Sequence, residues 1–236
     1  MNIDLSNYPL FQDNDIKSLT LLSDQGFSNK NYTFQDRNTT YLLRKFILHG
    51  RDRTLEYKIQ LLAYEENIAA KPFMLDLDNE LMICEFLEGE HRSTLAKEDL
   101  LELVKVLKKL HAIKIDSEPV KLEGLFTLKT KELEEAFNIL EEYPKEMLLC
   151  HNDLNPKNLI FSNNSLKCID WEFAGMNDLY FDLASVSVEF SLDDEMEEYF
   201  LAQYFEVISW NKSKLEAYKT IYIALCKQWF QTQETT

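Results

Sequence analysis

Apolar positions in the first half of the chain recur with the two-residue period of strands, apart from one stretch with the period of a helix. Four short runs rich in β-branched and aromatic residues predict strands: 31–35, 41–47, 73–76 and 81–86. Apolar residues at helical spacing from Leu55 to Ala63 predict a helix over 53–66. The polar segments 36–39 and 76–80 are the expected turns. This half therefore predicts a small β-rich unit with a single helix.

The second half of the chain is mostly helical in its periodicity. Five amphipathic runs predict helices: 97–113, 129–142, 180–190, 193–209 and 213–231. Pro144 ends the second of these, and Ser213 with Glu216 is a candidate capping box for the last. Two apolar runs, 158–161 and 166–169, predict one strand hairpin among the helices.

The two halves meet at Leu87–His91, where Gly89 interrupts an acidic stretch that we expect to be exposed. The domain prediction is therefore a β-rich unit over 1–86, a hinge over 87–91 and a helical unit over 92–236. Because the strands are grouped first and the helices follow, the predicted fold class is α+β.

The chain of 236 residues is 45% hydrophobic and 12% aromatic, so we expect it to be globular. Its 25 Lys and Arg residues against 41 Asp and Glu residues give a net charge of −16. Nucleic acid and anionic membrane surfaces require clustered basic charge, so neither is an expected partner. A cationic substrate suits this charge, although acidity also serves solubility alone.

Targeting and redox signals are absent from the sequence. No apolar run reaches the roughly 18 residues of a membrane span, and Met1–Ser6 lacks the basic and apolar regions of a secretory signal. The cysteines lie far apart and form no Cys-x-x-Cys pair, so we expect reduced thiols. These features predict a cytoplasmic location without membrane insertion.

Three polar side chains around the strand hairpin are the strongest chemical signal. Asp153 follows His151 on a short loop that ends near Asn158, and Asp170 follows the second strand, which folds back beside the loop. In phosphoryl transfer, one carboxylate orients the substrate hydroxyl, while an amide oxygen and a second carboxylate hold magnesium against the nucleotide phosphates. We therefore assign Asp153 as the catalytic base and Asn158 and Asp170 as metal ligands. A plain turn would also favour Asp153 and Asn158, but it would require neither Asp170 nor His151.

This arrangement resembles the catalytic loop and metal-binding aspartate of the protein-kinase-like small-molecule kinases. Segment 169–184 resembles the choline and ethanolamine kinases, within the aminoglycoside phosphotransferase and protein-kinase-like superfamily. Five residues stand in register with that branch: Glu172, Asn177, Phe181, Asp182 and Glu189. The resemblance extends over most of the chain. It implies a two-lobed protein-kinase-like fold, with a small β-rich N-lobe and a larger helical C-lobe, and ATP and Mg²⁺ as cofactors.

The resemblance also implies a set of nucleotide-binding residues: Gly26, Ser28, Asn29, Arg44, Glu56 and Glu85. The first three resemble a phosphate-covering loop, although the segment would serve equally well as a plain hairpin turn. Arg44 takes the place of the basic residue that binds the phosphates, with Glu56 as its ion-pair partner; a solvated strand cation is the alternative. Strand alternation puts Lys45 on the opposite face. The family often shows an Arg and a Glu at the spacing of Arg53 and Glu56. Glu85 begins the linker whose backbone is expected to hold adenine.

A quaternary ammonium group donates no ordinary hydrogen bonds, so its recognition needs aromatic faces and a nearby carboxylate. The candidate substrate residues are Asp153, Glu172, Phe173, Glu189, Phe190, Tyr222 and Trp229. For each aromatic residue, a place in the core is the alternative. By the resemblance, Asp182 braces the catalytic loop and His151 orients it. The C-terminal helix lacks the family's usual tryptophan pair and has Cys226 and Trp229 there.

The sequence thus predicts an ATP- and Mg²⁺-dependent small-molecule kinase, with choline, converted to phosphocholine, as the expected acceptor. An ethanolamine or aminoglycoside kinase is the alternative among enzymes. A catalytically silent pseudokinase that serves as a binding module is the alternative from another class. It is disfavoured because all three polar catalytic positions are present.

Overall fold

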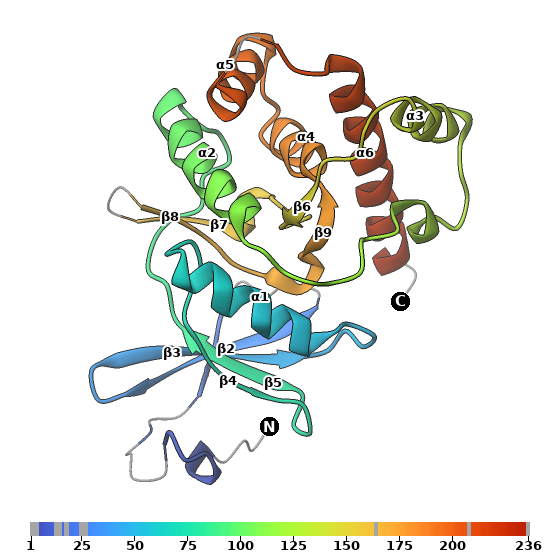
Figure 1. The fold of residues 1–236 in the computed structure, drawn as a ribbon. Coiled ribbons are helices and arrows are strands. Elements are labelled where there is room, and N and C mark those ends of the chain that lie inside the picture. Colours follow the sequence, from blue (N-terminus) through green and yellow to red (C-terminus); the bar gives the residue numbers. More distant parts are fainter. Residues whose placement is uncertain are drawn as a thin grey trace. The chain divides into compact units, whose positions relative to one another are not determined.

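The structure is a computed structural model that describes residues 5–11, 16, 19–23, 28–162, 165–206 and 209–234 (Figure 1). The chain divides into two compact units, Met1–Glu88 and Gly89–Thr236, which we call unit 1 and unit 2. The division falls inside segment 87–91, whose role as a hinge stays a prediction.

Unit 1 is built on an antiparallel sheet of five strands in the order β1-β2-β3-β5-β4. The strands are β1 Thr20–Leu21, β2 Asn29–Asp36, β3 Thr39–Phe46, β4 Pro72–Asp76 and β5 Leu81–Glu85. One helix, α1 (Arg53–Glu65), packs against β4, and its first turn is capped by Asp52, whose side chain accepts the Leu55 N–H at 2.9 Å. The four predicted strands and the helix are confirmed, whereas no bounds were predicted for β1, which has only two residues.

The core of unit 1 includes a segment that carried no sequence signal. Phe11, which is fully buried, sets its ring edge-on to Phe34 and Tyr41, with both centroids at 5.2 Å. Leu5 belongs to the same cluster, and Tyr8 donates a hydrogen bond to Asp76 at 2.8 Å. The N-terminal residues therefore complete the aromatic core of the sheet.

Unit 2 is mainly helical, as predicted (Figure 1). Its helices are α2 Lys97–Ala112, α3 Lys131–Glu141, α4 Leu179–Glu189, α5 Asp194–Phe205 and α6 Lys212–Glu234. Its strands are β6 Met147–Cys150, β7 Leu159–Ser162, β8 Ser165–Cys168 and β9 Gly175–Asp178. The long α6 packs beside α3 and α4, and α5 packs against α2. The predicted β7–β8 hairpin is confirmed, but the β6–β9 pair was missed because its two strands are far apart in the sequence and β9 ends in polar side chains.

The start of α6 differs from the prediction. Asn211, not Ser213, caps the helix, because its side-chain oxygen accepts the Lys214 N–H at 2.9 Å. Asparagine is as good a cap as serine, and it stands two residues earlier in the sequence. The predicted capping box from Ser213 to Glu216 is therefore wrong.

Gly89 has a role in packing. A Cβ atom at this position would lie 2.5 Å from Ile160 Cγ2 and 2.5 Å from the Phe161 carbonyl oxygen. The approach is this close because Glu90 and Phe161 exchange backbone hydrogen bonds of 2.9 and 3.0 Å. The glycine is thus required by the contact with β7, and not by a left-handed backbone.

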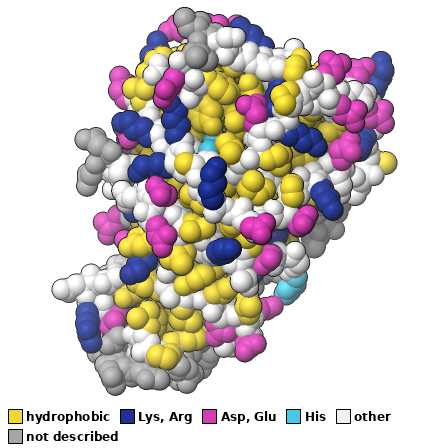
Figure 2. All heavy atoms as spheres, in the orientation of Figure 1, with side chains coloured by type: hydrophobic (Ala, Val, Ile, Leu, Met, Phe, Trp, Pro, Cys, Tyr) yellow, Lys and Arg dark blue, Asp and Glu magenta, His cyan; other side chains and the backbone are white. Residues whose placement is uncertain are grey.

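Charged side chains of both signs are mixed on the face drawn in Figure 2, where Asp and Glu lie among Lys and Arg. Among the described helices, none combines the length and the apolar character that a bilayer span would require.

Candidate active site

The loop after β6 is held by a buried carboxylate of α4. Asp182, with no exposed surface, accepts the backbone N–H groups of His151 and Asn152 at 2.9 and 2.8 Å. His111 at the end of α2 lies 3.2 Å from the same carboxylate through its Nε2 atom, and its Nδ1 atom lies 2.6 Å from the Tyr204 hydroxyl. The predicted brace is confirmed, and His111 and Tyr204 extend it to α2 and α5.

His151 connects the loop to the segment that leads into Asp170. Its ring is buried, and its Nε2 atom lies 3.0 Å from the Ile169 carbonyl oxygen, which accepts the Nε2 hydrogen. The ring also lies 4.8 Å from Trp171. With its Nε2 hydrogen used in this way, His151 is suited to orient the loop rather than to remove a substrate proton.

Asp153 is surrounded by donors from its own loop. Asn158 Nδ2 donates to Asp153 Oδ2 at 2.7 Å, and Asn155 Nδ2 donates to Asp153 Oδ1 at 3.0 Å. Burial raises the pKa of Asp153, His151 and the two amides oppose that shift, and the charge of Asp170 adds to it. The carboxylate is therefore positioned by hydrogen bonds and carries a raised proton affinity, as a catalytic base requires.

The hairpin brings Asp170 beside the loop, as predicted. The Ile169 N–H donates to the Asn158 carbonyl at 3.0 Å, so Asp170 directly follows a residue bonded to the loop. Asp170 has a left-handed backbone with φ of 63°, and Asn152 has the same with φ of 66°. Such backbone costs energy for residues other than glycine and is concentrated at functional sites.

Two asparagines support this geometry, and sequence reasoning missed the first of them. Asn152 Nδ2 donates to the Phe173 carbonyl at 2.9 Å, while Asn152 Oδ1 accepts from Asn177 Nδ2 at 2.8 Å. The pair ties the catalytic loop to the turn that follows Asp170. Only its residue type could have pointed to Asn152, because asparagine tolerates the left-handed backbone that this position has.

A second carboxylate lies in the same electrostatic cluster as Asp153. Tyr222 on α6 donates its hydroxyl to Glu189 at 2.8 Å. Burial raises the pKa of Glu189, the Tyr222 hydrogen bond lowers it, and the charge of Asp153 raises it further. Cys226 lies one turn after Tyr222 on α6. Burial raises the pKa of its thiol to about 11, and the charges of Glu189 and Asp153 add to this rise. We call Asp153, Glu189, Tyr222 and Cys226 the acidic cluster.

The predicted aromatic faces separate into two groups. Phe173 and Trp229 are half-buried and meet edge to face, with ring centroids 5.8 Å apart. Phe190 is only 5% exposed and belongs to the core, so the structure does not support it as a cage face. Tyr222 is 2% exposed and contributes through its hydroxyl. Glu172 is half-buried on the turn that follows Asp170.

The predicted ion pair in unit 1 is confirmed. Arg44 Nη1 donates to Glu56 Oε1 at 2.7 Å, and both residues are buried. Lys45 lies on the other face of β3 and donates to Glu80 at 3.1 Å. Arg53, at the first position of α1, donates to the second oxygen of Glu56 at 2.6 Å. The spacing of Arg53 and Glu56 was noted in the sequence, but the bond from Arg53 Nη2 to the Leu48 carbonyl at 3.1 Å was not predicted.

Of the other predicted nucleotide-binding residues, the structure gives side-chain contacts for Asn29 and Glu85. Asn29 is buried, and the amide orientation that satisfies its neighbours places Oδ1 on Arg44 Nη2 at 2.8 Å and Nδ2 on the Ser28 carbonyl at 3.1 Å. Glu85 ends β5, and its side chain accepts the Lys71 N–H at 3.2 Å. Gly26 lies outside the described residues. Asn29 therefore positions Arg44, and the roles of Ser28 and Glu85 stay predictions.

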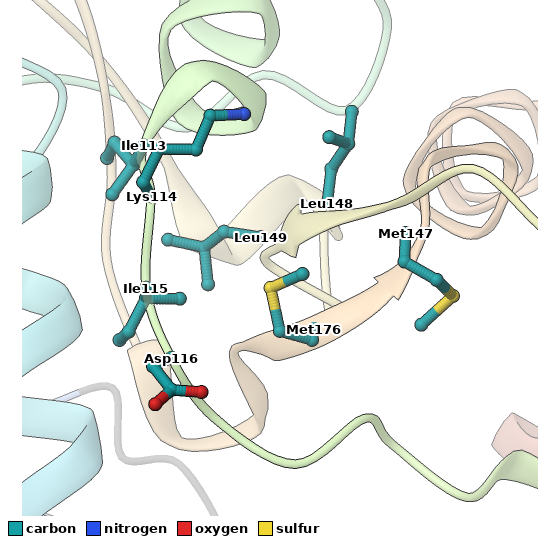
Figure 3. Close-up of a pocket in the computed structure, with 8 residues that line it drawn as sticks. All are labelled: Ile113, Lys114, Ile115, Asp116, Met147, Leu148, Leu149 and Met176. Atoms are coloured by element: carbon teal, nitrogen blue, oxygen red, sulfur yellow. The ribbon is translucent and has the colours of Figure 1, made fainter.

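Two further features of unit 2 stand apart from the predicted site. A hollow of about 370 Å³ lies between segment 113–116 and strands β6 and β9, where Ile115, Leu149 and Met176 gather (Figure 3). None of the predicted site residues lines it. His111, Cys150 and Asp182 place ligand atoms within 4.8 Å of one another, but Asp182 is already occupied by the loop backbone. That cluster is structural.

Comparison with known proteins gives a family match over most of the chain. A model described as the phosphotransferase enzyme family (APH) matches residues 19–218. Among curated proteins, Protein LicA of Haemophilus influenzae is 40% identical over 74 residues, which span 30% of this chain but only 28% of that protein. A Protein LicA homolog of Metamycoplasma hominis is 26% identical over 229 residues, which span 90% of this chain and 88% of that protein.

Solved structures give the same fold. The crystal structure of choline kinase LicA from Streptococcus pneumoniae has a TM-score of 0.76 at 24% identity and covers 93% of this chain and 86% of that one. A structure of LicA in complex with AMP has a TM-score of 0.73 at 22% identity, with coverage of 95% and 86%. The predicted α+β, protein-kinase-like fold is confirmed.

Proposed function

The chain belongs to the phosphotransferase enzyme family, and on that premise we propose that it is an ATP- and Mg²⁺-dependent kinase of a small amino alcohol, with choline as the acceptor. Family membership confirms the prediction of a small-molecule kinase in this superfamily. The acceptor, the metal and the individual site residues belong to the proposal.

One observation carries the choice of a cationic acceptor. Asp153 and Glu189 both have raised pKa values, because each is desolvated and because the charge of Asp153 acts on Glu189. A pair of half-buried carboxylates with this repulsion is stabilised by a cation placed near both groups. A quaternary ammonium group supplies that charge and requires no hydrogen-bond acceptor.

The aromatic residues near the cluster fit the same acceptor. Trp229 lies two helical turns after Tyr222 on α6, and its ring contacts Phe173, which follows Asp170 in the chain. Tryptophan gives the strongest cation–π interaction among the side chains. An amino alcohol held by these residues and Glu189 would present its hydroxyl to Asp153.

Asp153 would orient the acceptor hydroxyl and remove its proton. Its carboxylate accepts the hydroxyl proton as the acceptor oxygen forms its bond to phosphorus, and the bond from phosphorus to the nucleoside diphosphate oxygen breaks. Asn155 and Asn158 hold the two carboxylate oxygens, so the base is oriented before the acceptor binds.

The donor set beside Asp153 fits Mg²⁺. Asn158 uses its amide nitrogen on Asp153, so its amide oxygen is the atom that would contact a metal. Asp170 would add a charged oxygen, and hard oxygen ligands are those that Mg²⁺ selects. The ion would supply positive charge against the nucleotide phosphates. In unit 1, Arg44 would bind the phosphates, and Glu56 would fix its guanidinium.

The test is Mg²⁺-dependent phosphate transfer from ATP to choline, ethanolamine and kanamycin, followed by ³¹P NMR of the products. We expect phosphocholine, with activity that depends on added Mg²⁺. Faster phosphorylation of ethanolamine or kanamycin would support the alternative acceptors. No transfer to any of the three, with nucleotide still bound, would support a pseudokinase that serves as a binding module.

A further inference from the structure

Six residues of unit 1 form a closed ring of hydrogen bonds around the Arg44–Glu56 pair. Starting at the Ser28 carbonyl, the ring passes through Asn29, Arg44, Glu56, Arg53 and Leu48 and returns to Ser28. Its bonds are 3.1, 2.8, 2.7, 2.6, 3.1 and 3.1 Å long in that order. The last bond is the Leu48 N–H donating to the Ser28 carbonyl. The ring therefore joins the start of β2, the centre of β3, the segment after β3 and the first turn of α1.

Arg53 is the member that closes the ring. Its Nη1 donates to Glu56 Oε2 and its Nη2 donates to the Leu48 carbonyl, while its guanidinium plane lies 4.2 Å from the Phe46 ring centroid. Only a planar group with several donors makes these contacts at once, so lysine is not equivalent here. Arg53 is also 7% exposed, which shields the bonds from competing water.

We propose that Arg53 is a positioning residue for nucleotide binding, because it locks Glu56 and, through Glu56 and Asn29, fixes both Arg44 and the residues that follow the predicted phosphate-covering turn. This inference rests on the proposed function. With Arg53 present, both Glu56 oxygens are occupied and α1 is tied to the strand segment after Phe46. Without it, Glu56 keeps one arginine partner and is free to rotate about its remaining bond.

The first experiment measures the affinity for Mg²⁺ with the β,γ-methylene analogue of ATP, by calorimetry on the full-length chain without acceptor. Arg53→Met should weaken binding about tenfold, because Arg44 is no longer preorganised. Arg53→Lys should recover only a small part of this loss. The KM for choline should change by less than about twofold, since the acidic cluster is untouched.

Gln60→Met is the matched control. Gln60 is buried on the same helix, 3% exposed, and donates to the Ala70 carbonyl at 3.0 Å, outside the ring. It should lower the melting temperature without changing nucleotide affinity. Equal affinity losses for Gln60→Met and Arg53→Met at equal melting temperature would overturn the proposal, because the effect would then be one of general stability.

A double variant tests whether the ring acts as a unit. Asn29→Ala opens the ring on the other side of Arg44, so combining it with Arg53→Lys should cost much less than the product of the two single losses. Losses that multiply would overturn the ring as a unit. Arg53→Lys with wild-type nucleotide affinity would overturn the role of Arg53 alone. A wild-type chain that binds no nucleotide would overturn the proposed function, and this inference with it.

Discussion

The ring of hydrogen bonds in unit 1 and the acidic cluster of unit 2 differ in how their charged side chains are paired. In the ring, Arg44 and Arg53 share Glu56 at 2.7 and 2.6 Å, so each charge has a protein partner of opposite sign. In the acidic cluster, Asp153 and Glu189 are both carboxylates, and the repulsion from Asp153 raises the pKa of Glu189. In the ring both oxygens of Glu56 bond to arginines, whereas the two carboxylates of the acidic cluster repel each other and are held by the neutral donors Asn155, Asn158 and Tyr222.

The difference indicates what each region contributes to the proposed reaction. A closed ring of opposite charges is rigid and holds a guanidinium ready for phosphate. Like charges held together cost stability, and that cost is tolerated where binding or catalysis depends on it. The acidic cluster is thus the place where substrate choice is expected to be made.

The largest expected effect comes from Asp153, the proposed catalytic base in the acidic cluster. Asp153→Asn keeps the shape of the side chain but removes the base, so turnover should fall about 10²- to 10⁴-fold. Steady-state kinetics with choline measure the turnover, and calorimetry measures the affinity for the nucleotide. Affinity for the ATP analogue should stay within about threefold of wild type. A variant that keeps more than about a tenth of wild-type turnover would rule out the assignment of Asp153.

Breaking the ring at its phosphate-binding member should have the next largest effect. Arg44→Ala should raise the KM for ATP by more than about tenfold, because the proposed phosphate ligand is lost. The control is Lys45→Ala on the opposite face of β3, where the side chain contacts Glu80. That variant should leave the KM for ATP close to wild type, and the reverse ranking would show that the wrong cation was assigned.

The aromatic edge of the acidic cluster sharpens the comparison further. Trp229→Ala removes one proposed cage face, and a desolvated cation–π contact of about 2 kcal/mol corresponds to about a 30-fold loss in choline affinity. Phe230→Ala is the matched control on α6, since Phe230 is 57% exposed. Equal losses for the two variants would mean that the ring of Trp229 is not a specific contact.

A smaller effect should appear in the pH dependence of choline affinity. In the proposed function choline binds to ionised Glu189, so its affinity should fall as the pH drops through the pKa of this group, which lies above its ordinary value of 4.5. Tyr222→Phe removes the hydrogen bond that lowers this pKa, so the fall should begin at a higher pH than in the wild type. Tyr218→Phe, one turn earlier, should not move the profile. A profile that stays in place, or shifts to lower pH, for Tyr222→Phe would contradict the role of Glu189.

In both the ring and the candidate active site, the residues predicted from the sequence are those whose separation is set by neighbouring elements of the chain. Asp153, Asn158 and Asp170 were found because a loop and a hairpin set their separation, and Arg44 with Glu56 because a strand and the next helix do. Long-range partners carried no such signal.

Asn152 and His111 acquire their roles only from residues that folding brings near them. Phe190 was assigned to the substrate cage because an aromatic residue next to Glu189 fits the pattern, but its burial depends on helices that are distant in sequence. Gly89 was correctly noticed, while the reason for it, the backbone of β7, was not visible from the sequence.

The claim that the acidic cluster selects a cation is tested most directly with a neutral copy of choline. In 3,3-dimethylbutan-1-ol a carbon atom replaces the nitrogen, so its shape and hydroxyl are those of choline and only the charge is missing. We predict that kcat/KM for choline exceeds that for this alcohol by about 30-fold or more in the wild type, and that Glu189→Gln reduces the ratio by about tenfold. Equal kcat/KM values for the two alcohols in the wild-type enzyme would contradict the claim.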